Sequence, residues 1–418
     1  MLAGAALAGA ALGWAGRPVH ASAAPLFGHV LPHAGPGTPL AVAVAAAVIG
    51  WGPRLADRLP WRPLLAAAWV ASVAWTFALA LVDGWHRGVT GRLTTRFEYL
   101  AEVPGVTDVP AMLRGFTARI LDGSADSWTT HVAGHPPGAL LVFVGLDRLG
   151  LSGGAWAAAA CVLAGCAATV AVAVTVRALG DENAARVALP FLVLFPGAVW
   201  VGVSADGLFT GLAAMAIALL AVGLSRPSRW LVAAGGAGLA ACAYLSYGLV
   251  LLALPVLAVI AVRRARFRLL GWAILGAALV VAAMTGLGFH WWEGYHLVQE
   301  RYYQGLASRR PYAYWIWANL AALTLSAGPA AVVVLRRAAK RAWTTHMPAA
   351  LLVVAAAAAI VAADLSGLSK AEVERIWLPF AVWLPAAAAL LPEPDRRGWL
   401  CLQAACALAV NHLVLTAW

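Results

Sequence analysis

Charge is scarce in this chain of 418 residues. Asp, Glu, Lys and Arg make up 11% of it, whereas soluble proteins contain roughly a quarter. Lysine is nearly missing, with Lys340 and Lys370 as the two lysines, and this bias towards arginine is typical of bacterial genomes rich in G and C. Because 62% of the residues are hydrophobic, the composition excludes an ordinary soluble domain and predicts a multi-pass membrane protein.

Cysteine and repeats are equally uninformative. The five cysteines fall inside apolar runs and lack metal-ligand spacing, so we expect them to act as small apolar residues. Heptads, solenoid repeats and low-complexity linkers are missing, and no nucleotide-binding loop is visible. The simplest expectation is a single transmembrane domain over residues 1–418.

Apolar runs long enough to cross a bilayer as helices recur along the whole chain. They predict an all-α, polytopic transmembrane helical bundle. The first run could be mistaken for a secretion signal, because Ala-Ser-Ala-Ala at 21–24 resembles a cleavage site, but it lacks a basic segment before it. We expect about thirteen spans: 1–16, 39–52, 63–82, 154–178, 187–203, 206–224, 230–246, 248–262, 269–289, 314–335, 347–364, 376–392 and 399–417.

The net charge of +11 comes mainly from arginines in short loops between these runs, for example at 54–62, 263–268 and 336–341. The positive-inside rule explains that placement better than nucleic-acid binding does. All these loops fall on one side, the cytoplasmic one, if 138–151 lies along the outer surface as a juxtamembrane helix. Loop 83–153 is then a long external loop with juxtamembrane helices.

This first external loop is the longest polar stretch, and it ends on His131-Val-Ala-Gly-His135-Pro-Pro-Gly138. A carboxylate held at the membrane face could act as general base on an acceptor hydroxyl. The alternative is a solvated loop with ordinary surface acids. Its acidic residues are Glu98, Glu102, Asp108, Asp122 and Asp126.

Two later external segments carry arginines among aromatic or acidic residues. Arg309 and Arg310 stand before Tyr312 in an aromatic-rich segment, where arginine forks could bind phosphate and the alternative is interfacial anchoring. The second segment is Ser369-Lys370-Ala-Glu-Val-Glu374-Arg375. Its positive charge opposes the orientation bias, so either an anionic lipid phosphate or a Glu–Arg pair that closes the loop would explain it.

This arrangement of an early acidic external loop, Asp108 at 27 positions before His135-Pro-Pro, and a late external Arg375 resembles the GT-C superfamily of membrane glycosyltransferases. The closest pattern is the protein O-mannosyltransferase and aminoarabinose-transferase branch, whose loop begins with an acidic pair and ends in His/Lys-Pro-Pro-Leu. The chain also looks like uncharacterised integral membrane proteins of high-GC Gram-positive bacteria. It departs from the branch in two places, because Val109 follows Asp108 and Gly138 replaces the leucine.

The resemblance implies inverting transfer of a sugar from a polyprenyl-phosphate donor to a glycan, lipid or protein acceptor at the outer face of a bacterial plasma membrane. Asp108 is the first candidate for the base by spacing and Glu98 the second. His135-Pro-Pro could equally shape a helix start, and Asp206 could be a helix N-cap. Candidate donor phosphate-binding residues are Arg375, Lys370, Arg309 and Arg310, and candidate substrate-binding residues are His131, His135, Glu102, Asp206, Tyr312 and Glu374.

We expect no tightly bound metal ion, with a divalent cation as the open alternative, because the outward carboxylates lack regular ligand spacing. The rival function is a multi-span transporter or lipid flippase, which would usually place ionisable residues near the middle of the membrane on broken helices. The predicted spans contain almost no charge, and paired halves are not visible. A non-catalytic membrane scaffold would explain the spans but not the clustered external acids and arginines.

Overall fold

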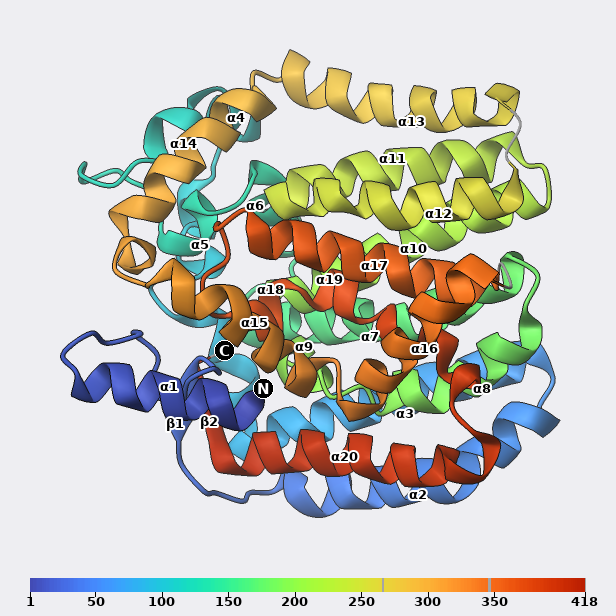
Figure 1. The fold of residues 1–418 in the computed structure, drawn as a ribbon. Coiled ribbons are helices and arrows are strands. Elements are labelled where there is room, and N and C mark those ends of the chain that lie inside the picture. Colours follow the sequence, from blue (N-terminus) through green and yellow to red (C-terminus); the bar gives the residue numbers. More distant parts are fainter. Residues whose placement is uncertain (265–266, 345–346, 418) are drawn as a thin grey trace.

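The computed structural model describes residues 1–264, 267–344 and 347–417. Helices fill most of this chain, and the longest of them run side by side as one bundle (Figure 1). Residues 265–266, inside the predicted basic run 263–268, lie outside the described residues.

The first half of the chain forms α1 (Leu2–Trp14), α2 (Gly37–Arg58), α3 (Trp61–Ala80), α4 (Val109–Gly115), α5 (Thr130–Ala133), α6 (Pro137–Arg148), α7 (Gly154–Ala178), α8 (Glu182–Val193) and α9 (Ala198–Val201). Between α3 and α5 lie the short helices η1 (Leu81–Asp83), η2 (His86–Thr90), η3 (Arg92–Thr94), η4 (Tyr99–Ala101), η5 (Val103–Gly105) and η6 (Thr117–Arg119).

The second half forms α10 (Ala205–Ser225), α11 (Arg229–Leu245), α12 (Ala253–Arg263), α13 (Phe267–Gly286), α14 (Trp291–Gln304), α15 (Tyr312–Ser326), α16 (Pro329–Thr344), α17 (Pro348–Leu365), α18 (Val373–Ile376), α19 (Leu378–Ala381) and α20 (Arg396–Leu413). Its 3-10 helices are η7 (Tyr247–Leu252), η8 (Leu306–Ser308), η9 (Leu384–Leu390) and η10 (Glu393–Asp395).

Six helices of the described chain are long and apolar enough to cross a membrane, and a bent pair would raise the number to seven. They coincide with predicted spans: Gly37–Arg58, Trp61–Asp83, Gly154–Ala178, Ala205–Ser225, Arg268–Gly286 and Pro348–Leu365. Further predicted spans form shorter apolar helices, among them Leu2–Trp14 and Arg229–Leu245. The count of thirteen spans therefore stays a prediction.

The predicted span 314–335 is not one straight helix. Its chain bends by 109° between α15 and α16, at Ala327-Gly328. A bend inside an apolar bundle frees backbone groups that need partners. Gln403 of α20, which is fully buried, supplies both, because its Oε1 accepts from the Ala330 N–H (3.1 Å) and its Nε2 donates to the Ala327 carbonyl (3.4 Å).

Proline interrupts two other predicted spans. Pro196 stands between α8 and α9 in the predicted run 187–203, and the predicted run 376–392 is divided into α18, α19 and η9. Proline removes a backbone donor and fixes φ, so it breaks helices that hydrophobicity alone would continue. The all-α prediction also misses a small antiparallel sheet in which β1 (Gly28–Val30) pairs with β2 (Val414–Thr416).

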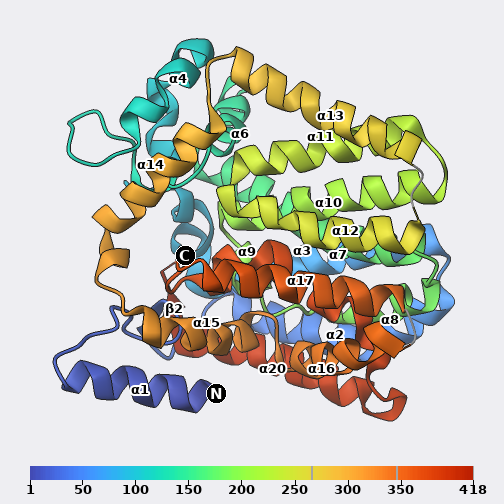
Figure 2. The ribbon, with the colours of Figure 1, turned by 45° about the horizontal axis from the view of Figure 1, so that its top comes forward.

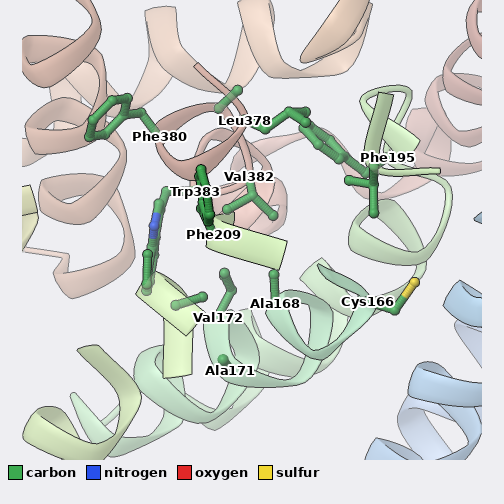
Figure 3. Packing of buried hydrophobic residues seen from close by; sticks show 14 of the residues in the cluster. Cys166, Ala168, Ala171, Val172, Phe195, Phe209, Leu378, Phe380, Val382 and Trp383 are labelled. Atoms are coloured by element: carbon green, nitrogen blue, oxygen red, sulfur yellow. The ribbon is translucent and has the colours of Figure 1, made fainter. Parts of the chain in front are cut away.

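Helices α7 and α10 pack closely against each other in the core. A Cβ atom on Gly211 of α10 would collide with the Ala164 carbonyl of α7, so only glycine allows this approach. Small residues at a helix interface bring backbones close together in lipid. Figure 3 shows Ala168 and Val172 of α7 below Phe209 of α10, with Trp383 of the interrupted segment close to Phe209.

The predicted external loop gathers at one end of the bundle, which we call the loop end. It carries α4, α5, α6 and α14, and the two chain ends lie near it (Figures 1 and 2). Helix α6 forms where the juxtamembrane helix was predicted, and its 12 residues span about 18 Å, too short for a hydrocarbon core of about 30 Å.

Candidate functional site: a buried charge cluster at the loop end

Three segments far apart in the sequence bring charged side chains together at the loop end. The central contact joins Arg375 of α18 to Asp206 of α10, with Nη1 2.9 Å from Oδ2. Arg375 also donates through Nη2 to Oε2 of Glu372, 3.3 Å away. Arg375 and Asp206 are each 5% exposed. Burying charged groups costs desolvation free energy, so a gain in folding stability is a weak explanation for the presence of this cluster.

Asp206 stands in the first turn of α10, but it is not the cap. Ser204 is the N-cap, and its hydroxyl accepts from the Gly207 N–H (3.1 Å). The N-cap interpretation of Asp206 is therefore wrong. Its carboxylate is free to reach Arg375, and the positive end of the helix dipole favours a negative charge at this position.

Glu98 belongs to the same cluster. It is 3% exposed, and its Oε1 lies 2.9 Å from Nδ1 of His131. The second oxygen, Oε2, is buried and has no hydrogen-bond partner within the described chain. The pKa of Arg375 indicates that Glu98 lies near this arginine. Burial would lower that pKa, but the negative charges of Asp206, Glu372 and Glu98 raise it overall.

His135 packs between Tyr99 and Phe209, and a hydrogen bond holds it in one tautomer. Its Nδ1 lies 2.8 Å from the His131 carbonyl, and because a carbonyl only accepts, Nδ1 must carry the proton. Burial lowers the pKa of His135 and so favours the neutral ring, in which Nε2 is an acceptor. The ring packs at 5.8 Å from Tyr99 and 5.7 Å from Phe209, centroid to centroid.

The prolines after His135 begin a helix, as one interpretation expected. Pro137 is the first residue of α6, where the missing N–H of proline costs nothing. A Cβ on Gly138 would collide with the Tyr244 carbonyl of α11, so this position requires glycine. His135 therefore stands directly before the start of α6 and also lies close enough to Asp206 and Arg375 for their charges to act on its pKa.

Cationic groups line the other side of the cluster. Arg310 donates through Nη1 to the Lys370 carbonyl (2.7 Å) and to Oε1 of Glu372 (3.0 Å). The Lys370 ammonium donates to the Ala307 carbonyl (3.1 Å), and no carboxylate pairs with it among the described residues. Burial, followed by the charge of Arg310, lowers the pKa of Lys370. Arg309 is exposed beside them.

Glu374 contacts the N-terminal segment through a hydrogen bond. It is fully buried, and its Oε1 accepts from the Phe27 N–H at 2.8 Å. Burial raises the pKa of Glu374 to about 7, against the smaller opposing effect of that hydrogen bond. This hydrogen bond joins the N-terminal segment at Phe27 to α18. It suits a structural role for Glu374 as well as the predicted substrate-binding role.

Three predicted residues lie outside this set of contacts. Asp108 is exposed, and its Oδ1 accepts from the Ala111 N–H (3.0 Å) as the N-cap of α4. Glu102 accepts from the Thr129 N–H (2.9 Å) within the loop, and Arg119 lies 3.5 Å from it. The hydroxyl of Tyr312, an exposed residue, donates to the Leu365 carbonyl (3.2 Å).

The alternative of a Glu–Arg pair that closes the loop is confirmed, because Glu372 pairs with Arg375. Glu372 stands three positions before Arg375, a spacing at which opposite charges meet in a helical turn, and this signal was readable. The sequence did not single out Tyr99. Tyr99 is 1% exposed, and burial raises its pKa well above the usual range, helped by Asp206 and Glu98. Its sequence context, directly after Glu98, gave no separate signal.

A cavity of about 350 Å³ lies next to this cluster without including its charges. Its wall contains Leu100, Val103 and Leu146, together with Phe143, whose ring stacks on Tyr99 at 5.2 Å. The Tyr99–Phe143 pair therefore stands between the cavity and the histidines. Within the described residues, no group of three His, Cys, Asp or Glu side chains is arranged to hold a metal ion. Metal dependence stays a prediction.

Comparison with known proteins identifies no family for this chain. No protein-family model matches it, and no curated protein matches it. One similar solved structure is the oligosaccharyltransferase of Archaeoglobus fulgidus tethered with an acceptor peptide, at 13% identity and a TM-score of 0.47. The match covers 83% of this chain and 54% of that one, so this chain spans about half the length of that protein.

Proposed function

We propose that this chain is a membrane glycosyltransferase of the GT-C type. It would move a sugar from a polyprenyl-phosphate-linked donor to a glycan, lipid or protein acceptor at the outer face of a bacterial plasma membrane. The observation that carries the proposal is the buried convergence of Glu98, Asp206 and Arg375 at the loop end. Neighbouring titratable groups that perturb each other in this way are more common at active sites than elsewhere.

Glu98 is the preferred base on geometric grounds. His131 lies 2.9 Å from Oε1 of Glu98 and can orient this carboxylate. Oε2 of Glu98 is buried and has no hydrogen-bond partner in the described chain, a property that it shares with Oε2 of Glu374. In an inverting transfer, the acceptor oxygen attacks the anomeric carbon while the bond from that carbon to the phosphate oxygen breaks. The acceptor proton would pass to Oε2 of Glu98, and the bonding electron pair would leave on the phosphate.

Asp206 is a less suitable base than Glu98, because its carboxylate is already paired with Arg375. Its Oδ2 pairs with Arg375, so taking a proton would weaken a buried ion pair. Asp108 is exposed and caps α4, and solvent around it would oppose proton abstraction from an acceptor in a dry site. The order that the structure favours is therefore Glu98 before Asp108.

Lys370 is the preferred partner of the departing phosphate. Its ammonium has a backbone acceptor but no carboxylate partner among the described residues, whereas Arg310 and Arg375 are paired with carboxylates. A preorganised cation next to developing negative charge lowers the barrier without reorganisation at the moment of reaction. Arg309, exposed beside it, would extend the same positive surface.

The test is transfer of a labelled sugar in membranes that contain the chain, from a panel of polyprenyl-phosphate-linked donors. We expect the parent to transfer from at least one donor with inversion at the anomeric carbon, and Lys370→Gln to reduce the rate about 10²-fold. Membranes without the chain are the control. A parent that is folded but transfers from no donor would refute the proposal and favour transport, and a retained anomeric configuration would refute the single-step mechanism.

A further inference from the structure

Glu372 bridges the two arginines that were predicted to bind the donor phosphate. Its Oε1 lies 3.0 Å from Nη1 of Arg310, and its Oε2 lies 3.3 Å from Nη2 of Arg375. These arginines come from segments more than sixty positions apart, so a single carboxylate holds two distant parts of the loop end together.

A phosphate group could replace this carboxylate in the same contacts. Both groups present anionic oxygens a short distance apart, and arginine forks bind both in the same planar geometry. Lys370 lies next to the bridge, because its own carbonyl accepts from Nη1 of Arg310 at 2.7 Å. A phosphate there would meet three cations, two of which Glu372 contacts in the structure. One of these two, Arg375, also pairs with Asp206.

Glu372 is also the member of the bridge that is easiest to move. Its side chain is 19% exposed, whereas those of Arg310 and Arg375 are each 6% exposed. A rotation about its side-chain bonds would take the carboxylate into solvent and leave the arginines in place.

The backbone at this point is held in an unfavourable conformation. Ala371 and Glu372 have φ of 67° and 63°, the left-handed region that residues with a Cβ rarely adopt. Asn319 maintains it, because its Oδ1 accepts from the Ala371 N–H (3.2 Å) while its Nδ2 donates to the Ser369 carbonyl (2.8 Å). A buried amide thus fixes the turn that aims Glu372 at both arginines, and such strain is typical of functional sites.

We propose that Glu372 is an internal stand-in for the donor phosphate: it holds Arg310 and Arg375 in position and swings away when a phosphate-bearing ligand binds between them. The identity of that ligand as a lipid-linked phosphate rests on the proposed function. The Glu372 carboxylate then competes with other anions for Arg310 and Arg375. Weakly binding anions do not displace it, and the phosphate that does displace it binds with reduced affinity.

Binding of polyprenyl phosphate to the purified full chain tests this directly. Glu372→Gln keeps the size of the side chain and removes its charge, so we expect binding to tighten by about tenfold or more, because repulsion between two anions a few ångströms apart is removed. Glu372→Asp is one methylene shorter and cannot span both arginines, so it should tighten binding to a smaller extent. Glu293→Gln, on an exposed face of α14, is the matched control and should bind like the parent.

Two further ligands separate the sources of the effect. Inorganic phosphate should show the same order of variants if the bridge recognises phosphate itself, and an effect confined to polyprenyl phosphate would assign it to the lipid-linked form. Polyprenol, which lacks phosphate, should bind all variants alike. Equal tightening for polyprenol, or unchanged or weaker polyprenyl phosphate binding in both Glu372 variants, would overturn the inference.

These outcomes are independent of sugar transfer. A parent that transfers sugar while Glu372→Gln binds phosphate no better would leave the proposed function standing and refute the stand-in. Tighter phosphate binding by Glu372→Gln in a chain that transfers no sugar would support the stand-in and refute the proposed function.

Discussion

Breaking the Asp206–Arg375 pair from its two sides should cost different amounts of stability. Arg375→Gln leaves Asp206 buried, and Arg375 is its only ionic partner within the described chain. Removing one member of a buried pair in this way costs about 3–5 kcal/mol, because an uncompensated charge stays inside. Asp206→Asn leaves Arg375 with Glu372 at 3.3 Å, so the remaining charge keeps a partner.

We therefore expect Asp206→Asn to cost about 1–3 kcal/mol, which is the loss of one charged hydrogen bond. The double variant Asp206→Asn/Arg375→Gln should cost less than the sum of the singles, because neither charge is stranded. Reversible unfolding in detergent, followed by loss of helical signal at matched protein concentration, measures all three. Equal costs for the two singles, or additive costs in the double variant, would show that water screens the pair and would refute the burial on which the site depends.

Three other perturbations follow from single contacts, each measured by the same unfolding assay. Gln403→Leu should cost about 2–5 kcal/mol, because two backbone groups at the bend between α15 and α16 lose their buried partners. Burial raises the pKa of Glu374 to about 7 in the folded chain, so the free energy of unfolding should fall as pH rises from about 4.5 to 7, by about 3 kcal/mol at most. Glu374→Gln should remove this dependence of the free energy of unfolding on pH. Gly138→Leu should cost about 1–3 kcal/mol or prevent folding, because its Cβ would collide with the Tyr244 carbonyl, whereas Gly145→Ala on the same helix, with no atom near its Cβ, should not.

Hydrophobicity predicts the helices well where nothing in the sequence interrupts them. The runs at 154–178 and 206–224 became α7 and α10 almost residue for residue, because length and apolar composition suffice for a helix that bonds its own backbone. The bend after Ala327 was missed because Gly328-Pro329 lies inside an apolar run, and a residue 73 positions or more away, Gln403, makes that bend tolerable. The strands at 28–30 and 414–416 are too short to show a period.

The site was predictable in its parts but not in its connections. The sequence pointed to Glu98, Asp206 and Arg375 as separate candidates on the expected outer side, and the structure brings these three together. Spacing within one loop favoured Asp108, because distance along the chain says nothing about which carboxylate turns inward. Glu98 turns inward because His131 receives it, a pairing across 33 positions that no local pattern reveals.

The central claim is that the buried cluster performs chemistry, and the rate of sugar transfer by Glu98→Gln against Asp108→Asn tests it most directly. Both changes replace a carboxylate by its amide, at matched expression and with folding verified by the unfolding assay. We predict that Glu98→Gln lowers the transfer rate by at least about 10²-fold while Asp108→Asn stays within a few-fold of the parent. Full activity in Glu98→Gln, with loss in Asp108→Asn, would contradict the account and place the base on the exposed loop.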